Sequence, residues 1–316
     1  MTAAPTEVTK RHLLAIAGPT AVGKSEVALH LAEKLGGEII SVDSMQVYRG
    51  LDVGTAKPST EERARIRHHL LDLVDITGAF DAAQFVSLAN QAVEEILARG
   101  RLPILCGGSG LYFKAFFEGL GTAPIGISEL RSELEKIPLP ELLQELAERD
   151  PATYERIDRK NARRVVRAVE VIRLTGKPYS LQRADWSSPT AQPSQLPIFG
   201  LVRSSADLHQ RIEDRVDAMF RRGLVAETDA LLRAGLDRSR TAMQALGYRQ
   251  VVEHLRGLHS LPETIALVKI RTRQFAKRQM TWFRKQLPMQ WIAVQPDQPA
   301  EQIAEILRQF RLEFRL

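Results

Sequence analysis

The residues best suited to chemistry lie near the N-terminus, in the run Gly18-Pro19-Thr20-Ala21-Val22-Gly23-Lys24-Ser25. This run matches G-x-x-x-x-G-K-[ST] and stands between a short apolar segment and an amphipathic one, as a phosphate-binding loop requires. Its glycines let backbone N–H groups converge on phosphate oxygens, Lys24 supplies a positive charge, and Ser25 can coordinate Mg²⁺. The loop predicts a site for a diphosphate or triphosphate, without deciding whether phosphorus or carbon is attacked.

A second chemical group, Asp43, ends the apolar segment 38–43. Segments 13–17, 38–43 and 103–106 are expected to be strands, and helices at 25–35 and 82–99 alternate with them. Such alternation predicts βαβ units and a parallel sheet, whose ligands collect at the carboxyl ends of the strands. The phosphate-binding loop, Asp43 and Ser109 all follow such ends, so we expect them to build one site.

The rest of the chain completes this core and interrupts it. From Ile127 to Arg183 the pattern is helical and charged, and residues 187–193 are expected to form a loop. Strands at 197–202 and 290–294 return the chain to the sheet. We therefore predict an α/β fold, a P-loop NTPase-like parallel-sheet core made of residues 1–120 and 194–316, with a helical insertion domain at 121–193.

Positive charge is concentrated in the second part of the chain. Residues 1–120 hold 12 Lys+Arg and 14 Asp+Glu, which leaves 32 and 24 for residues 121–316. This imbalance indicates a polyanionic partner bound away from the N-terminal loop, although a merely solvated basic surface stays open on charge alone. Seven basic residues and no acidic one lie at 269–285, together with Trp282 and Phe283, a mixture suited to phosphate contact and base stacking. We expect at least one of these aromatics in the core.

Other features exclude several classes of site. The single cysteine, Cys106, rules out an intrachain disulfide or a cysteine-based zinc site, and it is expected to be buried and inert. Adjacent His68 and His69 point to different sides and have no evident third ligand, so a structural role is favoured over a metal site. Residues 1–11 lack a secretory signal, and no segment reaches the roughly 18 apolar residues of a membrane span. We expect a cytoplasmic monomer without a membrane partner.

Longer runs of sequence are similar to the tRNA dimethylallyltransferase family. Besides residues 18–25 they are DSMQVYRGLDVGTAKP at 43–58, HHLLD at 68–72, GGSGLY at 107–112, RVVRAVEV at 164–171, GYRQ at 247–250 and KRQMTWFR at 277–284. The runs at 43–58 and 277–284 are much more specific than the phosphate-binding loop. The resemblance implies transfer of a dimethylallyl group from dimethylallyl diphosphate to N6 of the adenosine 3′ to the anticodon, with Mg²⁺ and without ATP.

The resemblance gives the chemical groups roles. Asp43 would accept the proton of the attacking amine, with Mg²⁺ ligation or capping as its alternative. Lys24, Thr20, the loop amides and Mg²⁺ at Ser25 would stabilise the leaving diphosphate. Arg211 and Arg215 share one helix face and are expected to reach the same diphosphate, although Arg215 could instead pair with Glu213, Asp214 or Asp217 on the surface.

The target adenine has to leave the stacked anticodon loop to react. Asp43, Ser44 and Gln46 are expected to hold it, and Gln46 could make a bidentate contact with an adenine edge or serve as an ordinary loop residue. The residues expected to contact tRNA are Asp43, Ser44, Met45, Gln46, Ser109, Arg131, Arg163, Arg164, Arg167, Gly247, Tyr248, Arg249, Lys277, Arg278, Gln279, Thr281, Trp282 and Arg284.

Other functions share the phosphate-binding loop. A small-molecule kinase would have no use for the basic segment 269–285, and an isopentenyltransferase acting on free AMP or ATP would need neither that segment nor the insertion. A non-catalytic RNA-binding protein is disfavoured because Lys24, Ser25 and Asp43 are all intact.

Overall fold

The structure is a computed structural model that describes residues 12–124, 126–184, 186 and 198–313. The chain divides into two compact units, one containing residues 118–190 and the other residues 5–117 and 191–316. The first unit begins three residues before the predicted start of the insertion at 121. The loop expected at 187–193 and the segment 1–11 lie outside the described residues.

The larger unit is built on a six-stranded sheet in the order β3-β2-β4-β1-β5-β6, in which every neighbouring pair is parallel. The parallel α/β fold predicted from the sequence is confirmed. A two-residue strand, β3, was not predicted, because two histidines give no apolar run. The strands are β1 (Leu14–Ala17), β2 (Gly37–Val42), β3 (His68–His69), β4 (Leu102–Gly107), β5 (Ile198–Val202) and β6 (Gln290–Ala293).

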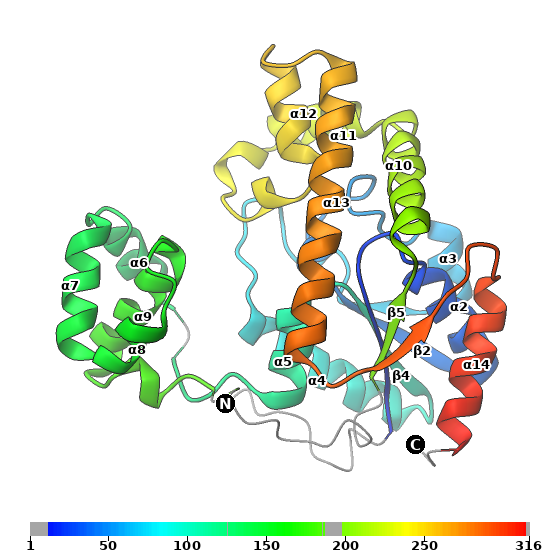
Figure 1. Cartoon of the computed structure of the whole chain (residues 1–316), viewed down its shortest axis with the longest axis horizontal. Helices are drawn as coiled ribbons and strands as arrows, with labels where there is room; N and C mark the ends of the chain where they lie inside the picture. The colour runs from blue at the N-terminus through cyan, green and yellow to red at the C-terminus, as the bar shows by residue number, and fades with distance from the viewer. Residues whose placement is uncertain (1–11, 125, 185, 187–197, 314–316) are drawn as a thin grey trace. The chain divides into compact units, whose positions relative to one another are not determined.

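Helices cover both faces of this sheet (Figure 1). On one face α2 (Lys24–Leu35) packs against α14 (Ala300–Glu313), and their buried aliphatic side chains share a core with β1, β4 and β5. On the other face α4 (Ala82–Ala98) packs against β2 and β4, as right-handed crossovers in opposite directions require. The helix α2 begins after Gly23 and ends at Gly36, both in the left-handed conformation that favours glycine.

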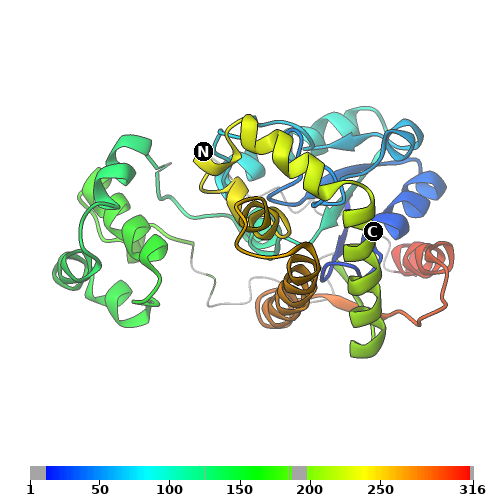
Figure 2. The ribbon, with the colours of Figure 1, turned by 90° about the horizontal axis from the view of Figure 1, so that it is seen from above.

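A long helix, α13 (Leu261–Gln286), runs from α12 (Tyr248–Leu255) at one end to α5 (Gly110–Glu118) at the other (Figures 1 and 2). Ser260 and Glu263 form a capping box at its start, and its buried face packs along α10 (Ser205–Arg221). The remaining helices of this unit are α3 (Thr60–Arg65), α11 (Leu224–Arg233) and the short 3₁₀ turns η3 (Leu236–Arg238) and η4 (Ala242–Gln244).

The smaller unit is helical, as predicted for residues 127–183. Leu134, Leu142, Leu146, Val165 and Val169 belong to its own buried core. Its elements are α6 (Ser128–Leu134), α7 (Leu139–Arg149), α8 (Pro151–Arg156), α9 (Ala162–Thr175) and the 3₁₀ turn η1 (Tyr179–Leu181). In neither unit is any described helix long and apolar enough to cross a membrane.

Candidate functional site

The phosphate-binding loop, residues 18–25, connects β1 to α2. Gly18 has a φ of 149°, and a Cβ there would stand 2.8 Å from the carbonyl oxygen of Leu201, so only glycine lets the loop pass β5. Gly23, with a φ of 104°, is the N-cap of α2. The unpaired N–H groups at the start of α2 therefore lie within the loop, the arrangement that binds anions at helix N-termini.

Three cationic side chains bind carbonyl oxygens of this loop. Lys24 Nζ donates to Pro19 O at 2.7 Å, and Arg211 Nε donates to Ala21 O at 3.0 Å. Arg203, which the sequence analysis missed, donates from Nε to Val22 O at 2.9 Å. Holding these carbonyl groups also fixes the peptide planes that carry the neighbouring N–H groups. Arg203 directly follows β5, so its strand-end position was a signal that could have found it.

Asp43 follows β2 and is held by the turn that it begins. Its Oδ1 accepts a hydrogen bond from Met45 N–H at 2.8 Å, and Ser44 N–H donates to Ser109 Oγ at 3.1 Å. The loops after β2 and β4 are thereby joined. The structure brings Thr20, Asp43 and Ser109 to one cavity, as expected from the strand ends.

This cavity, which we call the Asp43 cavity, has a volume of about 370 Å³ and two kinds of wall. The polar wall includes Thr20, Asp43, Ser44, Ser109, Arg215 and Gln279. The apolar wall, which the sequence analysis did not predict, includes Val216, Met219, Leu246, Val268 and Phe275. These residues come from α10, α13 and the segment before α12, and no motif distinguishes them in the sequence.

A second cavity of about 640 Å³, the Lys24 cavity, is lined by Lys24, Ser25 and Arg211 among other polar residues. Arg215 lines both cavities. The side chains predicted to bind phosphate therefore line one cavity, and Asp43, the predicted base, lines the adjoining one. Arg215 lies where the two cavities meet.

The Arg215 guanidinium faces this junction instead of pairing on the surface. Its Nη2 lies 3.4 Å from Thr55 O. Two of its proposed surface partners are bound elsewhere, since Glu213 pairs with Arg273 and Asp217 with Lys269. Burial lowers the pKa of Arg215, and the negative charge of Asp43 partly offsets this effect.

Burial also lowers the pKa of Lys24 to about 8; the positive charge of Arg215 adds to the lowering, and the negative charge of Asp43 acts in the opposite direction. A bound phosphate would place negative charge beside Lys24 and raise this pKa. Cys106 is buried as predicted, and burial raises its pKa to about 11, which keeps the thiol protonated.

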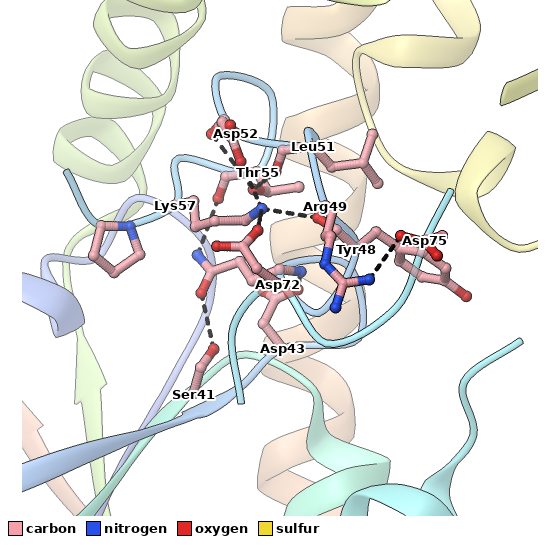
Figure 3. A network of polar contacts seen from close by, with 12 residues as sticks. Ser41, Asp43, Tyr48, Arg49, Leu51, Asp52, Thr55, Lys57, Asp72 and Asp75 are labelled. Atoms are coloured by element: carbon pink, nitrogen blue, oxygen red, sulfur yellow. Dashed lines mark hydrogen bonds and ion pairs between the residues drawn. The ribbon is translucent and has the colours of Figure 1, made fainter. Parts of the chain in front are cut away.

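The loop at 46–58 is organised around a buried lysine (Figure 3). Lys57, with 1% of its side chain exposed, donates from Nζ to Tyr48 O, Asp52 Oδ1 and Asp72 Oδ1 at 2.6–2.8 Å. Gln46 accepts a hydrogen bond from Ser41 Oγ and donates to the carbonyl oxygens of Thr55 and Ala56. An adenine contact by Gln46 would have to replace these bonds.

The basic segment of α13 divides into two groups. Lys269 and Arg273 pair with carboxylates of α10. Lys277, Arg278, Thr281 and Lys285 are exposed and, with half-buried Trp282, line a groove of about 500 Å³. Phe283 is fully buried, which confirms that one of the two aromatics belongs to the core. Arg284 is exposed and lies over the ring of Trp291.

The predicted tRNA ligands at 247–249 differ in accessibility. Tyr248 is fully buried and its hydroxyl donates to Glu227 Oε1 and accepts from Gly54 N–H, so an RNA contact by this side chain is not supported. Its neighbour Gly247 donates its N–H to the side chain of Gln250, whereas Arg249 is exposed and pairs with Glu253.

In the smaller unit, Arg131 and Arg167 both donate to the buried carboxylate of Glu170. Although burial alone would raise it, these hydrogen bonds hold the pKa of Glu170 below its ordinary value. Arg163 and Arg164 at the start of α9 are exposed. The unit therefore presents the second pair of arginines to solvent, while the first pair stabilises its interior.

The two histidines have the structural role that the sequence favoured. His69 Nε2 lies 2.7 Å from Glu38 Oε2, and Arg99 binds the same carboxylate. His68 Nδ1 lies 2.7 Å from Ile66 O. Among the described residues, no group of three or more His, Cys, Asp and Glu side chains is arranged to hold a metal.

The fold and site define an α/β P-loop protein with a carboxylate beside its phosphate-binding loop. The chain belongs to the IPP transferase family, since the family model of that description matches residues 46–286. It is 46% identical over 288 residues to tRNA dimethylallyltransferase 1 of Trichlorobacter lovleyi, which covers 90% of this chain and 94% of the relative. It is 44% identical over 302 residues to tRNA dimethylallyltransferase of Pelotomaculum thermopropionicum, covering 94% and 95%. The family resemblance found in the sequence is confirmed, and the chain is an enzyme of this family.

Solved structures agree. The full-length tRNA isopentenylpyrophosphate transferase from Bacillus halodurans matches with a TM-score of 0.70 and 37% identity, over 97% of each chain. A eukaryotic dimethylallyltransferase acting on tRNA matches with a TM-score of 0.77 and 26% identity, over 95% of this chain and 79% of that one.

Proposed function

We propose that this chain transfers the dimethylallyl group of dimethylallyl diphosphate to N6 of the adenosine 3′ to the anticodon in tRNA and releases diphosphate. The observation that carries the proposal is the junction of the two cavities at Arg215. A prenyl donor needs a polar space for its diphosphate beside an apolar space for its hydrocarbon chain, and the Lys24 and Asp43 cavities supply both.

The residues support a nucleophilic displacement at C1 of the prenyl group. The amine N6 attacks C1 of the prenyl group, and the C1–O bond breaks with its electron pair leaving on the diphosphate. Asp43 accepts the proton released by the amine. Lys24 and Arg215 stabilise the negative charge that develops on the leaving diphosphate. This stabilisation is the main electrostatic contribution to catalysis.

We also propose that Mg²⁺ binds together with the diphosphate. The exposed side chain of Ser25 stands at the start of α2 and lines the Lys24 cavity. No described cluster of acidic or histidine ligands could hold the ion alone, so phosphate oxygens and water would complete the set, as Mg²⁺ readily accepts. Bound there, the ion would neutralise negative charge on the diphosphate.

We propose that the enzyme meets this acceptor in the cytoplasm and acts there as a monomer. Light scattering on the full chain, alone and with an anticodon stem-loop, would test this. A mass of two chains in either sample would contradict a monomer.

The decisive experiment incubates the full chain with labelled dimethylallyl diphosphate and Mg²⁺. The acceptors are an anticodon stem-loop, the same stem-loop with guanosine at the target position, and AMP. We expect label only in the adenosine stem-loop. Transfer of label to AMP instead of the stem-loop would identify a free-nucleotide enzyme, and formation of ADP from ATP without any prenyl transfer would favour a kinase; either result overturns the proposal.

A further inference from the structure

Gln279 on α13 makes two partly buried hydrogen bonds to the edges of the candidate site. Its side-chain Oε1 accepts from Thr20 N–H at 2.9 Å, and its Nε2 donates to Gly108 O at 2.9 Å. The residue is 8% exposed. One side chain therefore links the phosphate-binding loop, the turn between β4 and α5, and α13.

The glycines of that turn make room for α13. A Cβ on Gly108 would stand 2.5 Å from Gln279 Nε2, and one on Gly110 would overlap the ring of Trp282. Gly108 does not have a left-handed backbone, so the approach of Gln279 accounts for a glycine at this position better than backbone conformation does. One turn further along, Lys114 Nζ donates to Gln286 O at 2.8 Å.

The same helix exposes its neighbouring residues Lys277 and Arg278 to solvent. Gln279 thus lies on the inward face of a helix whose adjacent side chains are basic and accessible. Its side-chain amide oxygen and amide nitrogen each make a hydrogen bond within the protein, so an RNA contact by this amide would have to compete with these bonds.

We propose that Gln279 is a positioning residue for the donor site and does not contact RNA. By holding Thr20 and Gly108, it fixes the phosphate-binding loop against the turn that carries Ser109, and Ser109 in turn holds the backbone beside Asp43. This replaces the RNA-contacting role predicted for Gln279. It rests on the proposed function only in assigning a diphosphate to the loop.

The test measures binding of inorganic pyrophosphate with Mg²⁺ to the full chain, without RNA. Gln279→Met keeps a side chain of similar volume and removes both hydrogen bonds, so the Kd should rise about tenfold. Affinity for an anticodon stem-loop should stay within about twofold, because no RNA contact is lost. Lys277→Met is the matched control, with weaker stem-loop binding and unchanged pyrophosphate binding. The reverse pattern for Gln279→Met, weaker RNA binding with unchanged pyrophosphate binding, overturns the proposal.

A second measurement stays informative if Gln279→Met is poorly folded. Gly108→Ala should weaken pyrophosphate binding in the wild-type chain and have a smaller effect when combined with Gln279→Ala, because the added methyl group then meets no amide. Additive effects would contradict the proposed contact. Neither experiment measures prenyl transfer, so an incorrect choice of prenyl donor or RNA acceptor would leave both results interpretable.

Discussion

At the scale of single residues, Asp43 is held by its own turn, with Oδ1 accepting the N–H of Met45. Asp43→Asn preserves this acceptor and removes the base. We expect the single-turnover rate to fall by about 10²–10⁴-fold, with pyrophosphate affinity nearly unchanged. The control is Asp75→Asn, an exposed carboxylate paired with Arg49. Near-normal transfer by Asp43→Asn would remove Asp43 from the mechanism.

The lowered pKa of Lys24 predicts how donor binding depends on pH. In the free enzyme Lys24 loses its proton near pH 8 because burial destabilises the charged form. A bound diphosphate favours the charged form and raises this pKa, so the affinity for pyrophosphate should fall as the pH rises through about 8. Calorimetry in buffers of different ionisation enthalpy should detect proton uptake on binding near that pH. Binding that is independent of pH from about 7 to about 9 would contradict the role of Lys24.

At the scale of elements, the strands and their helices could be predicted because each has an apolar run of regular period. The loop at 46–58 could not, since its centre is Lys57, a charged residue buried by partners that include Asp72 of a distant segment. A matching sequence motif also does not show which of its side chains face the protein interior. Tyr248 and Gln279 were both expected to contact tRNA, yet both are buried, whereas Lys277 is exposed.

The helix α13 allows its own controlled test. Lys277 lines the exposed groove, whereas Lys269 on the same helix pairs with Asp217 at 2.8 Å. If the groove binds the RNA backbone, Lys277→Met should lower the slope of log affinity against log salt by about 1. Lys269→Met should leave that slope unchanged. Equal effects of the two substitutions would indicate a diffuse attraction instead of a defined contact.

At the scale of the whole molecule, the two units carry different parts of the proposed task. The described phosphate-binding loop, Asp43 and both cavities belong to the larger unit. The smaller unit has its own core. Arg163 and Arg164 are exposed at the start of α9 and fit the expected attraction for RNA.

This division predicts separable effects on the two substrates. Arg163→Glu combined with Arg164→Glu should weaken binding of full-length tRNA by about tenfold or more, because two positive charges become negative near a polyanion. Pyrophosphate binding should not change, since its site lies in the other unit. Lys177→Glu, an exposed reversal just after the opposite end of α9, is the control and should have little effect. If the double variant bound tRNA as tightly as the wild-type chain, the start of α9 would have no part in RNA binding. The basic groove of α13 would then have to supply the RNA contacts assigned to α9.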